Sequence, residues 1–370
     1  MRLPKHIPQL DVLRGLAVLA VILYHAGDFV PALRLHTLFG FGYLGVDLFF
    51  VLSGFLITSI LVASKDEPSY FTNFYARRIL RIWPLYYALL LLTFVVLPLV
   101  RPSMAAPIFQ QSHPWEPYLF FVQNFFGNVQ RAFYMVRVTW SLAIEEQFYL
   151  VWPVIVWLAP RQVLKPLALG GIFLSIATRW SVQYGLIPPV NFFTNPLTRL
   201  DGLALGAFLS LWIPEAQDRT VRWGGVVALA LVVPATIMLG RVRPGHCVLY
   251  AMIAACFAAL LCASVAAPVL PRLAFLKYTG KVSYCLYLAH VPVFMAAGSL
   301  GFRHWCFPGS PRTSETIQFA VSLALCYVVA AASWRFYEGP FLRLRTHFES
   351  RRTATAGAPS VLALGERPGS

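Results

Sequence analysis

The first long apolar segment carries two side chains that could take part in chemistry, an arginine and a histidine. In LDVLRGLAVLAVILYHAG, Arg14 and His25 are eleven positions apart, and the residues between them are apolar or glycine except Tyr24. Eleven residues of α-helix return to nearly the same face, about 16 Å further along the axis. A charged group exposed to lipid is costly, so Arg14 must face protein or water. The spacing predicts one polar stripe that carries a guanidinium near one end and an imidazole toward the other.

Each of these two residues also has a structural interpretation. Arg14 could reach the membrane interface or pair with Asp11 one turn earlier, and His25 could be a hydrogen-bonded histidine inside a protein core. Because both residues fall on one stripe, we prefer the functional interpretation. An imidazole is the side chain best suited to act as a general base near neutral pH. His25 is therefore the candidate base.

Carboxylates occur in two further apolar segments. Asp47 lies in a very apolar run beside Ser53 and Gly54, and it needs a partner there, either a histidine that it orients or an arginine. Ser53 and Gly54 are expected to allow close helix contact rather than to bind a ligand. The adjacent Glu145 and Glu146 point about 100° apart on a helix, so both cannot face one cavity equally. We prefer Glu145, with helix capping as the alternative role.

A basic turn opens the third apolar segment, at Arg77, Arg78 and Arg81. Arg77 and Arg81 share a helix face, and Arg78 also lies one turn from Arg81. Guanidinium groups clustered in this way can hold phosphates through paired hydrogen bonds. The alternative is an anchor on the cytoplasmic side of the membrane, which we prefer for Arg77. Arg78 and Arg81 remain candidate phosphate ligands.

Two sets of polar residues follow later in the chain. Ser283, Tyr287 and His290 are spaced by four and three, which predicts one polar stripe on a helix. Such a stripe suits a hydrated cavity, or alternatively hydrogen bonds between packed helices. Arg199 and Asp201 could belong to a site or form a plain ion pair. The aromatic residues of the segment that begins at 140, Trp140 among them, are expected to pack or to lie at the membrane interface rather than to hold sugars.

The composition predicts the framework that must position these residues. Of the 370 residues, 58% are hydrophobic and 12% are charged, and the mean hydropathy is +0.65. A soluble domain has about 25% charged residues, so many of the apolar side chains here must face lipid. We predict an all-α, polytopic membrane helical bundle with about ten transmembrane helices. The ten segments are 10–27, 40–63, 79–100, 141–159, 166–186, 199–213, 222–240, 247–268, 281–300 and 316–337.

The formal net charge of +15 is best explained by membrane topology. Lysine and arginine are concentrated in alternate loops, which predicts that both termini are cytoplasmic and that the basic loops meet anionic lipids. We expect no nucleic-acid partner, because no binding motif accompanies the charge. We expect no metal either, because the six cysteines form no metal-ligand spacing with histidine. Residues 1–345 are predicted to form the membrane domain and 346–370 a disordered cytoplasmic tail.

Seven motifs in order resemble those of the acyltransferase-3 family of integral membrane sugar O-acyltransferases. The first is the arginine–ten residues–histidine spacing of Arg14 and His25, and the third places Arg78 and Arg81 in an arginine-x-x-arginine turn. The resemblance extends over about residues 10–341, and its other motifs are Gly42–Thr58, Thr139–Pro153, Arg199–Ala207, Gly280–Val293 and Phe336–Phe341. The sequence is identified as a member of this family, and the membrane domain of 1–345 would be its acyltransferase domain.

The resemblance implies an enzyme of the bacterial inner membrane that moves an acyl group, most often acetyl, from acyl-coenzyme A to a carbohydrate hydroxyl. His25 would be the base or a covalent acyl carrier, and Asp47 or Glu145 would set its tautomer. The phosphates of the donor would be held by Arg14, Arg78 and Arg81. Some family members carry an extracytoplasmic esterase-like domain; without one here, we expect this chain to act alone. The acceptor, a glycan or glycosylated metabolite, would contact Ser283, Tyr287, His290, Arg199 and Asp201.

Two other classes of function remain as alternatives. A transporter or exporter of a glycan or small solute would also place polar groups in apolar helices. The sequence contains no pair of repeated halves of the kind that marks many transporters, which counts against this class. The other alternative is a catalytically silent membrane protein that binds a glycan. Turnover of acyl-coenzyme A that depends on His25 would distinguish the enzyme from both.

Overall fold

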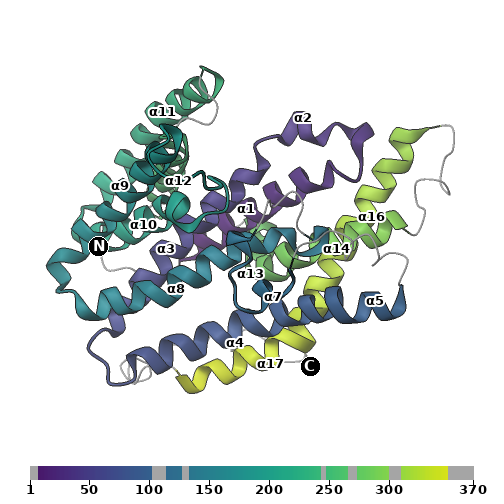
Figure 1. Cartoon of the computed structure of the whole chain (residues 1–370), viewed down its shortest axis with the longest axis horizontal. Helices are drawn as coiled ribbons and strands as arrows, with labels where there is room; N and C mark the ends of the chain where they lie inside the picture. The colour runs from purple at the N-terminus through teal and green to yellow at the C-terminus, as the bar shows by residue number, and fades with distance from the viewer. Residues whose placement is uncertain are drawn as a thin grey trace, which may run out of the picture.

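The computed structural model describes residues 7–101, 114–126, 133–242, 247–265, 273–299 and 310–348, and within these ranges the chain is helical and contains no strand (Figure 1). In hydrocarbon every backbone N–H and C=O needs a partner inside the protein, and a helix provides them within one segment. The α-helices are α1 Pro8–Ala26, α2 Leu35–Phe39, α3 Gly45–Ser64, α4 Tyr70–Leu91, α5 Leu97–Val100, α7 Glu116–Leu119, α8 Trp140–Leu158, α9 Leu164–Gln183, α10 Pro196–Trp212, α11 Asp218–Val242, α12 Leu249–Val265, α13 Ala274–Lys281, α14 Ser283–Ser299, α16 Pro311–Ala332 and α17 Gly339–Leu344.

Short helices of other types join these elements. Two π-helical segments extend α4 and α16, and single turns of tighter helix mark the ends of several others. The π-helices are η3 Leu92–Val96 and η10 Ser333–Glu338, and the 3₁₀ turns are η1 Pro31–Leu33, η2 Gly42–Leu44, η4 Gln123–Phe125, η6 Tyr134–Thr139, η7 Arg161–Val163, η8 Ile213–Glu215 and η11 Arg345–Phe348.

The predicted class, a multi-pass membrane helical bundle, is confirmed. Within the described ranges, seven helices are long and apolar enough to span a bilayer, and α13 with α14, bent by 77° at their junction, would make an eighth. The predicted segments 199–213 and 247–268 correspond to α10 and α12, which have 17 residues each. Helices of that length reach only about 26 Å, short of a hydrocarbon core of about 30 Å. The predicted number of ten spans is therefore not confirmed.

The helix that carries Arg14 and His25 lies near the middle of the molecule. α1 packs against α3, α13 and α14, while α9, α10, α11 and α12 gather on one side and α4, α16 and α17 on the other (Figure 1). Of the tail predicted to be disordered, 346–370, the first three residues belong to η11 and 349–370 lie outside the described residues. Helices of both groups thus contribute side chains around the polar stripe of α1.

Glycines let α3 and α10 approach each other closely. A methyl group added at Gly54 would meet the carbonyl oxygen of Leu203, and one added at Gly206 would meet that of Val51. Helix pairs in membranes are held together by such close contact, because lipid supplies no hydrophobic drive to bring them together. The role expected for Gly54 agrees with this geometry.

Gly54→Ala is expected to destabilise the protein by about 1–3 kcal/mol, because the added methyl must push two backbones apart. Gly170→Ala is the matched control, since a methyl there meets no atom within 4 Å and alanine favours helix. Thermal unfolding of the two purified variants in detergent measures the difference. Equal melting temperatures would show that α3 and α10 can accommodate a methyl group at position 54 without a loss of stability.

Candidate active site

Two histidines that are 265 positions apart in the sequence meet in the core of the bundle. His25 Nδ1 lies 3.0 Å from His290 Nε2, and His290 Nδ1 lies 3.2 Å from the carbonyl oxygen of Leu286. A carbonyl only accepts, so His290 Nδ1 carries a proton, and in a neutral ring its Nε2 is then an acceptor. His25 Nδ1 must donate to it. This chain of hydrogen bonds leaves Nε2 of His25 without a proton, so its lone pair can accept one, as a general base requires.

This arrangement differs from the one expected for the tautomer of His25. Neither Asp47 nor Glu145 is hydrogen-bonded to the ring; His290 has that place. Asp47 instead accepts a hydrogen bond of 2.7 Å from Arg199, because the buried guanidinium on α10 balances the charge of the carboxylate. The sequence put His290 among the acceptor ligands, whereas the structure buries it beside the candidate base.

His25 opens onto a cavity of about 610 Å³, called here the histidine cavity. Asp28 lies at its edge, where it is paired with Arg137, hydrogen-bonded to Tyr134 at 2.9 Å and paired with His36 at 3.0 Å. Six of its described lining side chains are tyrosine, tryptophan or phenylalanine, four are polar or charged, and two are valines. The lining residues are Tyr24, His25, Asp28, Tyr43, Val46, Arg137, Val138, Trp140, Asn191, Phe193, Tyr250 and Tyr287.

The other end of the α1 stripe opens onto a second, smaller cavity of about 110 Å³, called here the arginine cavity. Arg14, Arg78 and Arg81 all line it, and Glu145 is the only carboxylate among its described lining residues. Arg14 also pairs with Asp11 at 3.6 Å, and the buried Nε of Arg78 has no hydrogen-bond partner among the described residues. The cavity therefore carries excess positive charge and a donor without a protein partner.

The structure distinguishes the two adjacent glutamates. Glu145 lines the arginine cavity, and its two oxygens accept hydrogen bonds of 2.9 Å from Ser53 and Tyr149. Glu146 points instead to Trp83, whose indole nitrogen lies 3.3 Å from its Oε2. Ser53, expected only to allow helix contact, thus orients the cavity carboxylate. The preference for Glu145 agrees with this placement.

Two of the described residues are shared by the linings of the two cavities. Only Val46 and Tyr287 line both of them, as far as the described residues show. The Tyr287 hydroxyl lies 2.6 Å from Ser141 Oγ and 2.8 Å from the carbonyl oxygen of Val138, which it can bond as a donor. The polar stripe of α14 runs past this point, with Ser283 in the arginine cavity and His290 beside His25. Tyr287, held by these hydrogen bonds, therefore lies with Val46 where the two cavities adjoin.

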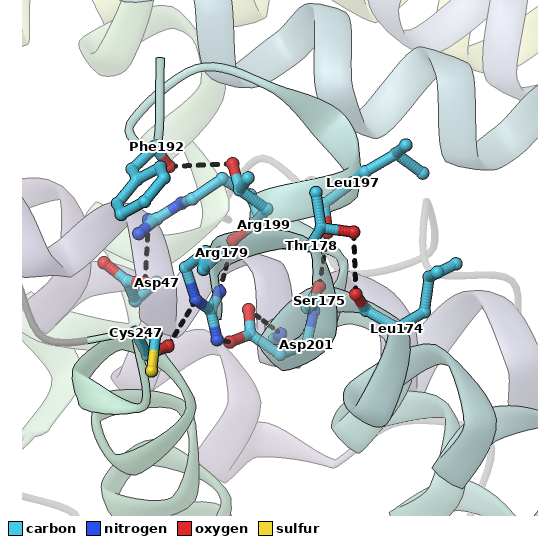
Figure 2. A network of polar contacts seen from close by, with 12 residues as sticks. Asp47, Leu174, Ser175, Thr178, Arg179, Phe192, Leu197, Arg199, Asp201 and Cys247 are labelled. Atoms are coloured by element: carbon cyan, nitrogen blue, oxygen red, sulfur yellow. Dashed lines mark hydrogen bonds and ion pairs between the residues drawn. The ribbon is translucent and has the colours of Figure 1, made fainter. Parts of the chain in front are cut away.

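A buried network of charged and polar side chains joins α3, α9 and α10 (Figure 2). Arg199 pairs with Asp47 at 2.7 Å, and Arg179 pairs with Asp201 at 2.8 Å. Arg179 also donates to the carbonyl oxygens of Cys247, at 2.6 Å, and Thr198. The plain Arg199–Asp201 pair considered from the sequence is not formed, since each residue has another partner. These bonds connect α3, α9 and α10 to one another and to the turn before α12. The four charged residues are not among the described lining residues of either cavity.

Several residues of the site carry no local signal in the sequence. Asp28 and Arg137 meet across 109 positions, and Arg179 is a lone arginine in an apolar helix. Only the rule that a charge inside a membrane segment needs a partner could have marked Arg179. No group of three or more histidine, cysteine, aspartate and glutamate side chains placed to hold a metal occurs in the described part of the chain.

Comparison with known proteins agrees with the seven motifs. A family model described as an acyltransferase domain, that of the acyltransferase-3 family, matches residues 7–335. The O-acetyltransferase OatA of Staphylococcus aureus is 28% identical over 382 aligned positions, which cover 91% of this chain and 57% of the relative. The peptidoglycan O-acetyltransferase OatA of Listeria monocytogenes is 27% identical, over 91% of this chain and 56% of the relative. No solved structure matches the chain.

The chain thus spans little more than half the length of these curated relatives. The family model, in contrast, covers nearly all of the described residues, including both cavities and the two histidines. Its match agrees with a multi-pass bundle of membrane-spanning helices. The chain belongs to the acyltransferase-3 family.

Proposed function

We propose that this protein is a membrane O-acyltransferase that moves an acyl group, most simply acetyl, from acyl-coenzyme A to a hydroxyl group of a carbohydrate. The observation that carries the proposal is the pair of cavities on one helix, with three guanidinium groups in one and the candidate base in the other. The relatives named O-acetyltransferase support the acyl group, and the one named for peptidoglycan supports a glycan acceptor.

The donor would bind on the arginine side. Coenzyme A carries several phosphates, and guanidinium groups pair with phosphate through two hydrogen bonds at once. Arg14, Arg78 and Arg81 offer such groups, and Arg78 has a buried N–H with no partner among the described residues. The distance of about 16 Å along α1 suits the extended arm that links the phosphates of coenzyme A to its thioester. The thioester would then lie near Tyr287.

The chemical step follows from the tautomer of His25. Its Nε2 would accept the proton of the acceptor hydroxyl while that oxygen attacks the thioester carbonyl. Collapse of the tetrahedral intermediate breaks the carbon–sulfur bond, and the proton passes from His25 to the departing thiolate. Throughout the reaction, His290 Nε2 would accept a hydrogen bond from the N–H of His25 Nδ1 and so stabilise the transient imidazolium. Glu145, held by Ser53 and Tyr149, would fix the position of the arginine groups around the donor.

The placement in the membrane follows from the donor. Acyl-coenzyme A is cytoplasmic, so the Arg14 end of α1 would face the cytoplasm of a bacterial inner membrane, with both termini on that side. The excess of positive charge in the corresponding loops supports this orientation. The histidine cavity would then face the opposite side of the membrane.

Release of free thiol from acetyl-coenzyme A, together with a mass increase of one acetyl group on an added oligosaccharide, tests the proposal with purified protein. We expect both signals to appear together and to depend on protein concentration. A protein that moves an unmodified solute across liposomes without an acyl donor would instead support the transporter.

Arg81→Gln is expected to raise the KM for acetyl-coenzyme A by about 10–100-fold with little change in kcat, because one charge-assisted phosphate bond of about 1.5–3 kcal/mol is lost. A donor that lacks the 3′-phosphate distinguishes an effect on phosphate binding from an effect on folding. The ratio of its KM to that of acetyl-coenzyme A should be larger for the wild type than for Arg81→Gln. Arg77→Gln is the matched control, since Arg77 is not among the described lining residues of the arginine cavity. An unchanged KM in Arg81→Gln would remove this residue from the donor site.

A further inference from the structure

We propose that the histidine cavity is the acceptor site and that it holds an uncharged sugar ring stacked against Phe193 and Trp140. This inference rests on the proposed function, because it identifies where and how the acceptor binds. The residues concerned lie outside the set that the sequence marked for the acceptor, and Trp140 was expected only to pack.

The size and lining of the cavity fit a small organic ligand. Its volume of about 610 Å³ falls within the range of about 300–1,000 Å³ typical of ligand pockets. Such pockets combine aromatic walls with a few polar groups that fix orientation. Phe193 and Trp140 lie side by side in the lining, with ring centroids 4.5 Å apart, and the polar lining residues include Asn191 and Asp28. A pyranose has the matching shape, since its ring faces carry C–H groups and its edge carries hydroxyls.

The aromatic wall is held in place from behind. The guanidinium of Arg199 lies 5.6 Å from the ring centre of Phe193, 5.9 Å from that of Trp140 and 4.4 Å from that of Tyr250. Arg199 is itself fixed by Asp47 in the buried network of Figure 2. Cation–π contacts of a desolvated arginine are strong, so the rings are positioned before any ligand arrives. A rigid aromatic face lowers the entropic cost of binding.

The charge of the cavity selects for an uncharged ring. Its carboxylate, Asp28, is paired with Arg137, so the described lining carries no excess of either sign apart from the protonation of His25. The arginine cavity, by contrast, has three guanidinium groups and one carboxylate. The two cavities therefore differ in the way that a phosphate-bearing donor and a neutral sugar acceptor require. His25 in the wall of the acceptor cavity would reach a hydroxyl at the edge of the ring.

The test measures binding without any acyl donor. The probes are chitotetraose, cellotetraose and maltotetraose, titrated calorimetrically into the purified full chain in detergent. We expect at least one of them to bind saturably, Phe193→Leu to weaken that binding at least tenfold, and Phe193→Tyr, which keeps the ring, to stay within threefold of wild type. Phe173→Leu is the matched control, because Phe173 is exposed on α9, away from both cavities. Thermal unfolding checks that each variant is folded.

Turnover separates this inference from the proposed function. With acetyl-coenzyme A present, Phe193→Leu should raise the KM for the sugar at least tenfold and leave the KM for the donor unchanged. Sugar binding that depends on Phe193 without any turnover would keep the acceptor site and remove the acyl transfer. Turnover with a KM for the sugar that Phe193→Leu does not change would keep the acyl transfer and overturn the acceptor site. No saturable binding of any of the three sugars to the wild type would also overturn the acceptor site.

Discussion

His25→Gln is expected to lower kcat for acetyl transfer by about 10²–10⁴-fold, the usual contribution of a general base. Glutamine can still hydrogen-bond to His290, which lies 3.0 Å from the wild-type ring, so the helix contact between α1 and α14 survives while the basic nitrogen is lost. The KM values for donor and acceptor should change little. Steady-state kinetics of the purified variant, with its melting temperature as a check on folding, provide the measurement.

His36→Gln is the matched control for this prediction. His36 lies near the same end of α1, where it pairs with Asp28, but it is not among the described lining residues of the histidine cavity. Its replacement should leave kcat within a few-fold of wild type. If His25→Gln kept most of the activity, or if both histidine variants lost it equally, His25 would not be the base.

Under the proposed function, His290 would act through His25 as a positioning residue. Replacing it by phenylalanine would remove the acceptor of the Nδ1 proton and free His25 to adopt the other tautomer. The expected loss in kcat is smaller than that of His25→Gln, and the wild-type and variant pH–rate profiles should differ in position as well as height. A structural role alone would lower stability without moving the pH profile.

Asp47→Asn is expected to destabilise the protein by about 3–5 kcal/mol, the cost of leaving a buried charge without its counter-ion. Arg199 is 1% exposed, and its Nε and Nη1 atoms have no hydrogen-bond partner among the described residues. The carboxylate of Asp47, 2.7 Å away, is therefore its charged hydrogen-bond partner among the described residues, in addition to the aromatic rings around it. Denaturant unfolding of the variant in mixed micelles gives the change in the free energy of unfolding.

Two comparisons make the prediction specific. Arg161→Ala removes one partner of the exposed ion pair with Asp66, so it should cost about 0–1 kcal/mol. The double variant Asp47→Leu with Arg199→Met removes both buried charges and should recover much of the stability lost in Asp47→Asn. An Asp47→Asn variant as stable as Arg161→Ala would mean that the guanidinium has other compensation. If the double variant recovered stability but did not bind sugar, Arg199 would be needed to position the aromatic wall and not only for folding.

The sequence predicted the helices better than it predicted their contacts. Apolar runs interrupted by charges located each long helix of the described ranges, because helix formation depends on local sequence and on the need to satisfy the backbone in lipid. It also placed Ser283, Tyr287 and His290 on one stripe, since helical periodicity alone decides which residues share a face. The number of full spans was less well predicted, because α10 and α12 are apolar enough but short.

The pairing of His25 with His290 could not be derived from spacing. The two residues are 265 positions apart, and their contact depends on how α1 packs against α14. The same holds for Asp47, for which the sequence allowed either a histidine or an arginine partner; the choice of Arg199 comes from the packing of α3 on α10. Local patterns therefore located the polar groups, and tertiary packing decided which of them meet.

Acyl transfer across a membrane can be measured in sealed vesicles that contain the protein, with radiolabelled acetyl-coenzyme A trapped inside and chitotetraose outside. Molecules whose arginine cavity faces the lumen should transfer label to the external sugar, and those with His25→Gln should not. Transfer observed only when donor and sugar share one compartment would contradict the proposal that the donor enters the arginine cavity from one side of the membrane and the sugar enters the histidine cavity from the other.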